Sequence, residues 1–243
     1  MQLKLITIDF WNTLFTTDAN CFRNSAPLKV LLQTLNDIGV SFTEQQFDSI
    51  LHDSWQYYND KWTNETRTPP ADEILNFIWN ALNLPPNPKA LDYIIDFFEK
   101  SILYFPPSLE PNALGAIQEL SKKYILGIVS DTGFSPGANM TQMMEEIGVA
   151  QYFSGYSYSD ETGVAKPHPK AFSTLLEKFN IKPHEALHIG DIEHTDITGA
   201  KDLGMHAIRY DGNIESVVVH LKTLETRADV ILYEWTDILD YLK

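Results

Sequence analysis

The chain has 243 residues and 44% of them are apolar, so it can bury a hydrophobic core and is not intrinsically disordered. Its 33 acidic residues against 18 lysines and arginines give a net charge of −15, which disfavours nucleic acid and anionic membranes as partners. A single cysteine, Cys21, excludes an intramolecular disulfide. With neither a signal peptide nor an apolar run of about 18 residues, the sequence predicts a cytoplasmic protein.

The first part of the chain predicts one strand and then helices. Residues 3–9 are a short apolar stretch that ends on an acidic residue and is typical of a buried strand. From about residue 25 to 104, apolar residues recur at helical spacing in four stretches, one of which begins after Thr43, a plausible N-cap. This block is therefore predicted to be all-helical.

Beyond Pro106-Pro107, predicted helices alternate with predicted strands. The strands are expected at 124–130, 152–159, 186–191, 205–210 and 228–232. The helices are expected at 111–122, 136–147, 169–179 and 195–203, with a final helix between the last strand and Lys243. Such alternation predicts a parallel sheet with helices on both faces, to which the first strand also belongs. The sequence thus predicts a Rossmann-like, doubly wound α/β core from residues 1–16 and 105–243, with an all-helical cap domain, residues 17–104, inserted after the first strand.

Six polar residues stand at or near the ends of these strands: Asp9, Thr13, Ser130, Lys166, Asp191 and Asp196. Open parallel sheets bind ligands beyond the carboxyl ends of their strands, so these side chains are expected to meet at one rim. Three carboxylates at short range repel one another unless a cation compensates them, and Mg²⁺ is the cation that best suits oxygen ligands. A hydroxyl and a lysine could then hold phosphate oxygens while Asp9 attacks as a nucleophile.

The order of these residues resembles the haloacid dehalogenase-like superfamily. Its four motifs match Asp9-Phe10-Trp11-Asn12-Thr13-Leu14, then Ser130, then Lys166, then Gly190-Asp191 with Asp196, and the helical block lies where the family carries a cap. The resemblance implies that Asp9 is the nucleophile, that Thr13 orients it, and that Ser130 and Lys166 hold the transferring group.

The same resemblance implies the metal ligands, while positions beside the motifs and in a cap loop indicate which residues contact the substrate. Asp9, the backbone carbonyl of Trp11 and Asp191 would bind Mg²⁺, and Asp196 would bind it directly or act through water or a hydrogen bond to Lys166. The substrate is expected to contact residues beside the motifs and in a cap loop, namely Trp11, Asn12, Asp131, Thr132 and Arg67. Arg23 is the other cap arginine that could reach an anionic substrate.

Trp11 departs from the phosphatase pattern. Family phosphatases carry a second Asp at this position, which protonates the leaving group and later deprotonates water. Indole does neither near neutral pH, and loss of a general acid–base costs about two to four orders of magnitude in rate. Other branches also lack this Asp: the true 2-haloacid dehalogenases carry Tyr, the phosphonatases Ala and the cation-pumping ATPases Thr. The dehalogenases need no metal and replace Gly-Asp by uncharged Ser and Asn, so Gly190-Asp191 favours a metal and a phosphoryl substrate.

The sequence therefore predicts a Mg²⁺-dependent hydrolase of a small phosphorylated metabolite, acting through an aspartyl-phosphate on Asp9 as a monomer or homodimer. Two alternatives stay open: carbon–halogen hydrolysis of a 2-haloacid, and a non-catalytic phospho-ligand-binding or regulatory protein.

Outside the motifs, His188 is interpreted as a packed strand residue and His168 as a helix cap. Trp55, Trp62 and Trp79 could line an apolar pocket, but their helical spacing favours an interpretation as cap core residues.

Overall fold

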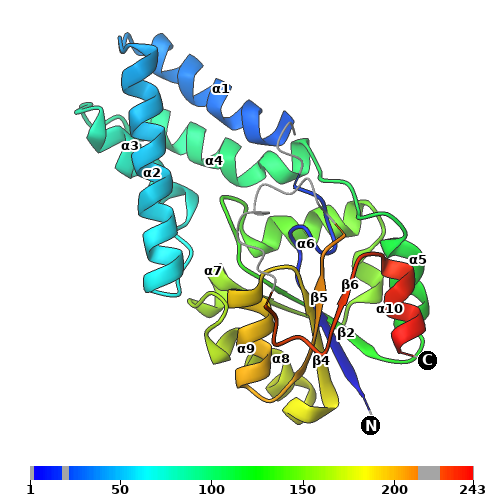
Figure 1. The fold of residues 1–243 in the computed structure, drawn as a ribbon. Helices are drawn as coiled ribbons and strands as arrows, with labels where there is room; N and C mark the ends of the chain where they lie inside the picture. Colours follow the sequence, from blue (N-terminus) through cyan, green and yellow to red (C-terminus); the bar gives the residue numbers. More distant parts are fainter. Residues whose placement is uncertain (1–2, 18–21, 213–224, 243) are drawn as a thin grey trace.

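The computed structural model describes residues 3–17, 22–212 and 225–242, with the backbone alone for 22–25. Its sheet has six parallel strands in the order β3-β2-β1-β4-β5-β6 (Figure 1). The strands are β1 (Leu5–Ile8), β2 (Ile125–Ser130), β3 (Gly155–Tyr158), β4 (Ala186–Gly190), β5 (His206–Tyr210) and β6 (Val230–Leu232). The chain runs outward from β1 through β2 to β3 and then returns to the other side of β1 for the remaining three strands.

Helices cover both faces of the sheet. Successive side chains of a strand point to opposite faces, so apolar strands expose an apolar surface on each face that helices bury. On one face, Ile6 and Ile8 pack with α5 (Ala113–Leu120), α6 (Gly137–Glu146) and α10 (Trp235–Tyr241). On the other face, Leu5 packs with α8 (Pro169–Phe179) and α9 (Thr198–Asp202). The predicted doubly wound α/β core is confirmed.

Residues 22–104 form a helical cap that projects from the sheet (Figure 1). It consists of α1 (Phe22–Asp37), α2 (Glu44–Asn64), α3 (Ala71–Ala81) and α4 (Pro88–Tyr104), which share a hydrophobic cluster of their own. Thr43 caps α2 as expected, in a capping box with Gln46. The all-helical insertion is therefore present, while its limits at 17 and 104 stay a prediction. Among the helices of the described residues, none combines the length and the apolarity that a membrane span requires.

Some elements differ from the prediction in their limits. The strand expected at 152–159 is shortened to β3, because residues 150–152 turn as a 3-10 helix, η1 (Ala150–Tyr152). The helix expected from residue 195 begins two residues earlier as a π-helical turn, η3 (Glu193–Ile197), before it continues as α9. Besides η1, two short elements were not predicted, α7 (Ser159–Thr162) and η2 (Pro183–Glu185), since a single turn is too short to show a hydrophobic period.

Candidate active site

The site lies where the chain reverses its direction across the sheet. β1 pairs with β2 on one side and with β4 on the other, and the connections on the two sides run in opposite directions. Asp9 directly follows β1 and Asp191 directly follows β4, so two neighbouring strands bring a carboxylate each to the same rim. This switch point is where open α/β sheets bind their ligands.

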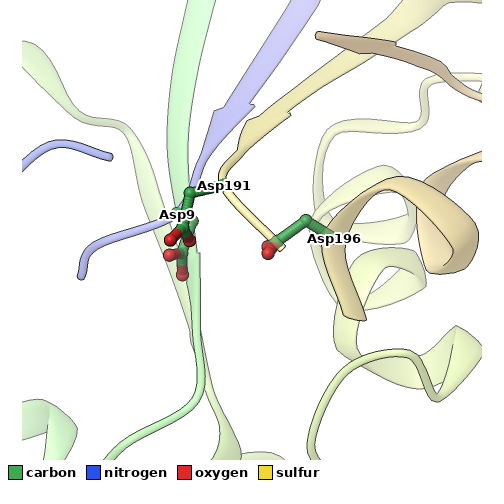
Figure 2. Close-up of side chains that lie close together, drawn as sticks. All are labelled: Asp9, Asp191 and Asp196. Atoms are coloured by element: carbon green, nitrogen blue, oxygen red, sulfur yellow. The ribbon is translucent and has the colours of Figure 1, made fainter. Parts of the chain in front are cut away.

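Asp9, Asp191 and Asp196 form a buried carboxylate cluster. One oxygen from each side chain lies within 4.8 Å of the others, and the three residues are 5%, 1% and 1% exposed. Figure 2 shows the carboxylates of Asp9 and Asp191 side by side, with that of Asp196 directed toward them. Carboxylate oxygens are the ligands that Mg²⁺ prefers, and so much buried negative charge requires cations nearby. The cluster therefore fits a divalent metal ion.

Lys166 supplies part of the compensating charge. Its Nζ donates to Oδ1 of Asp9 at 2.5 Å and to Oδ1 of Asp196 at 2.6 Å, and the residue is 3% exposed. Burial alone would lower the pKa of the lysine, but the carboxylates of Asp196 and Asp9 outweigh it and raise that pKa. The ammonium therefore stays charged, and the expected hydrogen bond between Lys166 and Asp196 is present.

The two carboxylates that share Lys166 differ in their acidity. Burial raises the pKa of Asp9 to about 7, because the attraction of Lys166 offsets only part of the desolvation and Asp196 adds repulsion. Burial acts in the same direction on Asp196, but the charge of Lys166 and a hydrogen bond with His188 outweigh it and hold the pKa of Asp196 below its ordinary value. One lysine is thus too little positive charge for the cluster.

His188 positions Asp196 from inside the sheet. Its Nε2 lies 3.0 Å from Oδ1 of Asp196, and its Nδ1 lies 2.9 Å from the hydroxyl of Thr7. Burial lowers the pKa of His188, which favours the neutral ring, and because the Asp196 carboxylate only accepts, Nε2–H of His188 donates to it. The hydroxyl of Thr7 lies between Nδ1 and the carbonyl of Leu187, to which it donates at 3.3 Å. The interpretation of His188 as a packed strand residue is confirmed, and so is that of His168, whose side chain accepts from the backbone N–H of Lys170.

The turn after β4 fixes the other oxygen of Asp196. Oδ2 accepts from the backbone N–H of Ile192 at 3.1 Å and from the hydroxyl of Thr195 at 3.2 Å. Gly190 makes room for this arrangement, since a Cβ at that position would lie 2.4 Å from Cγ of Asp196. The π-helical turn η3 and the glycine together place Asp196 over the end of β4.

The remaining motif residues surround the cluster without all facing the same space. Thr13 is fully buried, and its hydroxyl has no hydrogen-bond partner among the described residues. Ser130 ends β2 beside β1, and its hydroxyl donates to the carbonyl of Asp131 over a long distance of 3.5 Å. Asn12 has a left-handed backbone, with φ of 57°, and its side-chain oxygen accepts from the hydroxyl of Thr17.

Thr132, expected to contact the substrate, is not among the residues that line the cavity. Its hydroxyl contacts that of Ser159 at 2.9 Å.

A cavity of about 610 Å³ lies between the cap and the core, directly over the cluster. Asp9, Asp191 and Lys166 contribute to its floor, and Trp55 and Trp62 of α2 line its wall. The interpretation of these two tryptophans as cap core is wrong, whereas Trp79 does pack in the cap cluster. An apolar stripe that faces a cavity has the same helical period as one that faces a core, so the spacing could not separate the two roles.

Helix α2 of the cap is hydrogen-bonded to the loop that follows β2. The indole N–H of Trp62 donates to Oδ2 of Asp131 at 2.8 Å, and the backbone N–H of Lys166 donates to Oδ1 at 2.9 Å. The hydroxyl of Tyr58 donates to the carbonyl of Thr132 at 3.2 Å. Burial raises the pKa of the Asp131 carboxyl. Tyr58 was not predicted as a site residue, because no motif marks it, and Trp62 was assigned to the cap core in preference to a pocket.

The structure brings Arg67 to Glu73 instead of to the other candidate site residues. The guanidinium donates through Nη1 and Nη2 to the two carboxylate oxygens at 2.7 and 3.0 Å, and Tyr57 donates to the same carboxylate. Arg67 is not among the residues that line the cavity. This bidentate pair explains why the loop position of Arg67 does not deliver its charge to the site. The side chain of Arg23 lies outside the described residues.

Comparison with known proteins agrees with this geometry. A family model of haloacid dehalogenase-like hydrolases matches residues 3–204, and the chain therefore belongs to this family of enzymes. It is 30% identical to a glyceraldehyde 3-phosphate phosphatase from Pyrococcus furiosus over 174 residues, which cover 69% of this chain and 68% of that protein.

Solved structures share the fold. A 2-haloacid dehalogenase from Pseudomonas syringae pv. Tomato has a TM-score of 0.72 at 20% identity, over 99% of this chain and 98% of that one. The haloacid dehalogenase-like (HAD) hydrolase YfnB from Bacillus subtilis, bound to magnesium, has a TM-score of 0.66 at 17% identity over the whole of both chains. Both likenesses extend over the core and the cap together.

Replacing Gly190 by alanine tests how the site holds Asp196. The new Cβ overlaps the Asp196 side chain, so we expect Gly190→Ala to lower the free energy of unfolding by about 1–3 kcal/mol. If the carboxylate cluster binds Mg²⁺, the ion should raise the melting temperature, and Gly190→Ala should reduce that rise; thermal unfolding with and without Mg²⁺ measures both effects.

Gly115→Ala is the matched control, because a Cβ there meets nothing within 4 Å and the residue lies in α5. We expect this variant to be neutral, or more stable by up to about 1 kcal/mol, with an unchanged response to Mg²⁺. An unchanged Mg²⁺ response in Gly190→Ala as well would contradict the role given to the Gly190–Asp196 contact.

Proposed function

We propose that this protein is a Mg²⁺-dependent phosphatase of a small phosphorylated metabolite and that it acts through an aspartyl-phosphate on Asp9. The observation that supports this most is the buried cluster of Asp9, Asp191 and Asp196 with Lys166 bonded across it. Membership of the hydrolase family and the phosphatase from Pyrococcus furiosus among its relatives point the same way.

The chemistry of the donor set suits the metal. Asp9, Asp191 and the backbone carbonyl of Trp11 would hold Mg²⁺, while Asp196 would act chiefly by fixing Lys166, to which it is already bonded. When bound, the ion would neutralise negative charge on the phosphoryl oxygens and on the carboxylates. Lys166 alone leaves the cluster with excess negative charge, and that excess is what a divalent ion would compensate.

The residues of the chain would then perform two displacements. A carboxylate oxygen of Asp9 would form a bond to phosphorus while the bond from phosphorus to the leaving oxygen breaks. Lys166 and Ser130 would hold the phosphoryl oxygens, and the buried hydroxyl of Thr13 would orient Asp9. Water would next attack phosphorus, releasing inorganic phosphate that carries the protons of that water and restoring the carboxylate.

Trp11 restricts which leaving groups the site can expel. Trp11 lines the same cavity as Asp9, and its indole has no proton to give near neutral pH, so the leaving oxygen would depart as an anion. Alkoxides are poor leaving groups under that condition, whereas phenolates and carboxylates are good ones. We therefore expect slow hydrolysis of alkyl phosphates and faster hydrolysis of aryl and acyl phosphates.

Metal removal tests phosphoryl transfer. We expect the protein to release phosphate from acetyl phosphate and from p-nitrophenyl phosphate with Mg²⁺, and to lose this activity when a chelator is added. Asp9→Asn, which keeps the size of the side chain but removes the nucleophile, should be inactive with either substrate. Metal-independent release, or full activity of Asp9→Asn, would rule out the proposed chemistry.

Restoring an acid at position 11 tests the account of the leaving group. Trp11→Asp should raise hydrolysis of an alkyl phosphate such as glycerol phosphate by about tenfold or more, because a general acid–base typically contributes about two to four orders of magnitude. Trp11→Asn is the control, since asparagine has the size of aspartate but no proton to give near neutral pH. Equal rates in the two variants, both folded, would count against the missing acid as the cause of slow turnover.

A second candidate function is hydrolysis of a carbon–halogen bond in a 2-haloacid. Trp11 favours it, because halide leaves as an anion and needs no proton at that position. The same first step would apply: an oxygen of Asp9 would form a bond to carbon while halide departs. Release of chloride from chloroacetate in the presence of chelator, with no phosphate release in any condition, would support this candidate over the phosphatase.

A further inference from the structure

The cavity over the cluster has mainly apolar walls. Phe134, from the loop after β2, packs against aromatic rings of the cap, with centroid distances of 5.7 Å to Trp55, 6.4 Å to Tyr58 and 5.4 Å to Phe98. The rest of the apolar wall includes Leu28, Leu51, Ile74 and Ile78. A cavity of about 610 Å³ is within the range of about 300–1,000 Å³ that encloses drug-sized ligands. There is thus room, beyond a phosphoryl group, for a bulky apolar body.

The charges that line the cavity disfavour a second anionic group on the substrate. Four of the lining side chains are carboxylates, Asp9, Asp131, Asp191 and Asp196, and among the described lining residues Lys166 is the one cation. That lysine is already bonded to two of the carboxylates. A bisphosphate or a phosphorylated acid would therefore place its second charge in a low-dielectric site without a counter-charge, which is costly.

A cationic substrate is not favoured either. Asp131 is the lining carboxylate that stands apart from the metal cluster, but both of its oxygens already accept hydrogen bonds, from the indole N–H of Trp62 and the backbone N–H of Lys166. These two bonds hold the carboxylate toward Trp62 and the Lys166 segment, so it is less free to turn toward a cationic group of a ligand. The part of the substrate beyond the phosphoryl group is best matched by an uncharged one.

The residue at position 11 independently favours an uncharged, aromatic leaving group. With Trp11 at the position of the acid, the oxygen that leaves must be stable as an anion, as a phenolate is. An aromatic ring attached to that oxygen would also stack or pack edge-on against the rings of the wall. Size, charge and leaving group therefore agree on one class of compound.

We propose that the substrate is the phosphate monoester of an aromatic, otherwise uncharged hydroxyl compound whose ring lies among Trp55, Phe134 and the neighbouring aliphatic residues of the cap. This inference rests on the proposed phosphatase function and specifies its substrate. The proposed substrate differs from glyceraldehyde 3-phosphate, the compound in the name of the Pyrococcus furiosus relative, because that three-carbon compound has no comparable apolar part.

A panel of substrates tests the inference with wild-type protein and Mg²⁺. Phenyl and 2-naphthyl phosphate have leaving groups of similar acidity, so a difference between them reports on burial of the second ring. We expect kcat/KM for 2-naphthyl phosphate to exceed that for phenyl phosphate by about tenfold or more, since even one methylene in an apolar pocket is worth about tenfold or more. Glyceraldehyde 3-phosphate and phosphocholine should be poorer substrates than either.

Variants of the wall separate ring binding from chemistry. Trp55 is 50% exposed, so Trp55→Ala should fold, and we expect it to lower kcat/KM for 2-naphthyl phosphate by about tenfold while changing that for acetyl phosphate less than about twofold. Tyr93→Ala is the matched control, because Tyr93 is an exposed aromatic residue of α4 outside the cavity lining. Phe134→Leu, which keeps an apolar side chain, is a second wall variant and should show the same selective loss.

The outcomes distinguish this inference from the function on which it rests. Turnover of acetyl phosphate without a preference for the larger ring, or a preference for glyceraldehyde 3-phosphate or phosphocholine, would overturn the inference and leave the phosphatase standing. Equal losses for both substrates in Trp55→Ala and Phe134→Leu would overturn it as well. Failure to hydrolyse any phosphate, acetyl phosphate included, would overturn the proposed function and the inference together.

Discussion

The charge of Lys166, buried between Asp9 and Asp196, is the interaction on which the rest of the site depends. An ammonium is tolerated at this depth only because both carboxylates bind it, and the carboxylates are tolerated only because it is there. His188 holds Asp196 from inside the sheet, the turn η3 holds it from above, and Gly190 gives it space. The surplus negative charge that remains is what makes a divalent ion the natural further component.

The cap completes the site from the opposite side. Trp62 of α2 donates to Asp131, and Asp131 also accepts from the backbone of Lys166, so a single carboxylate connects the cap with the segment that carries the lysine. The aromatic residues that α2 contributes to the cavity and the presence of Trp11 in its lining favour the same kind of substrate. A site without a leaving-group acid is suited to substrates whose leaving group is stable as an anion, and such groups are often aromatic.

Much of the core could be predicted from the sequence because its signals are local or tied to strand ends. Alternating strands and helices fixed the class of sheet, and the positions of Asp9 and Asp191 directly after two strands were enough to expect them at one rim. The wall of the cavity could not be predicted in this way. Whether Trp62 faces the cap core or the site depends on how α2 lies on the core, and Arg67 was misplaced because its partner Glu73 carries no motif.

The central claim is that Asp9 becomes phosphorylated during turnover, and a trapping experiment tests it most directly. Wild-type protein would be mixed with acetyl phosphate and Mg²⁺, quenched in acid within the turnover time, and mapped by peptide mass spectrometry. The account predicts a phosphoryl group on the peptide that contains Asp9, and its loss when the quench is delayed until the substrate is consumed. Phosphate release with no adduct at any time, or an adduct on another residue, would contradict it.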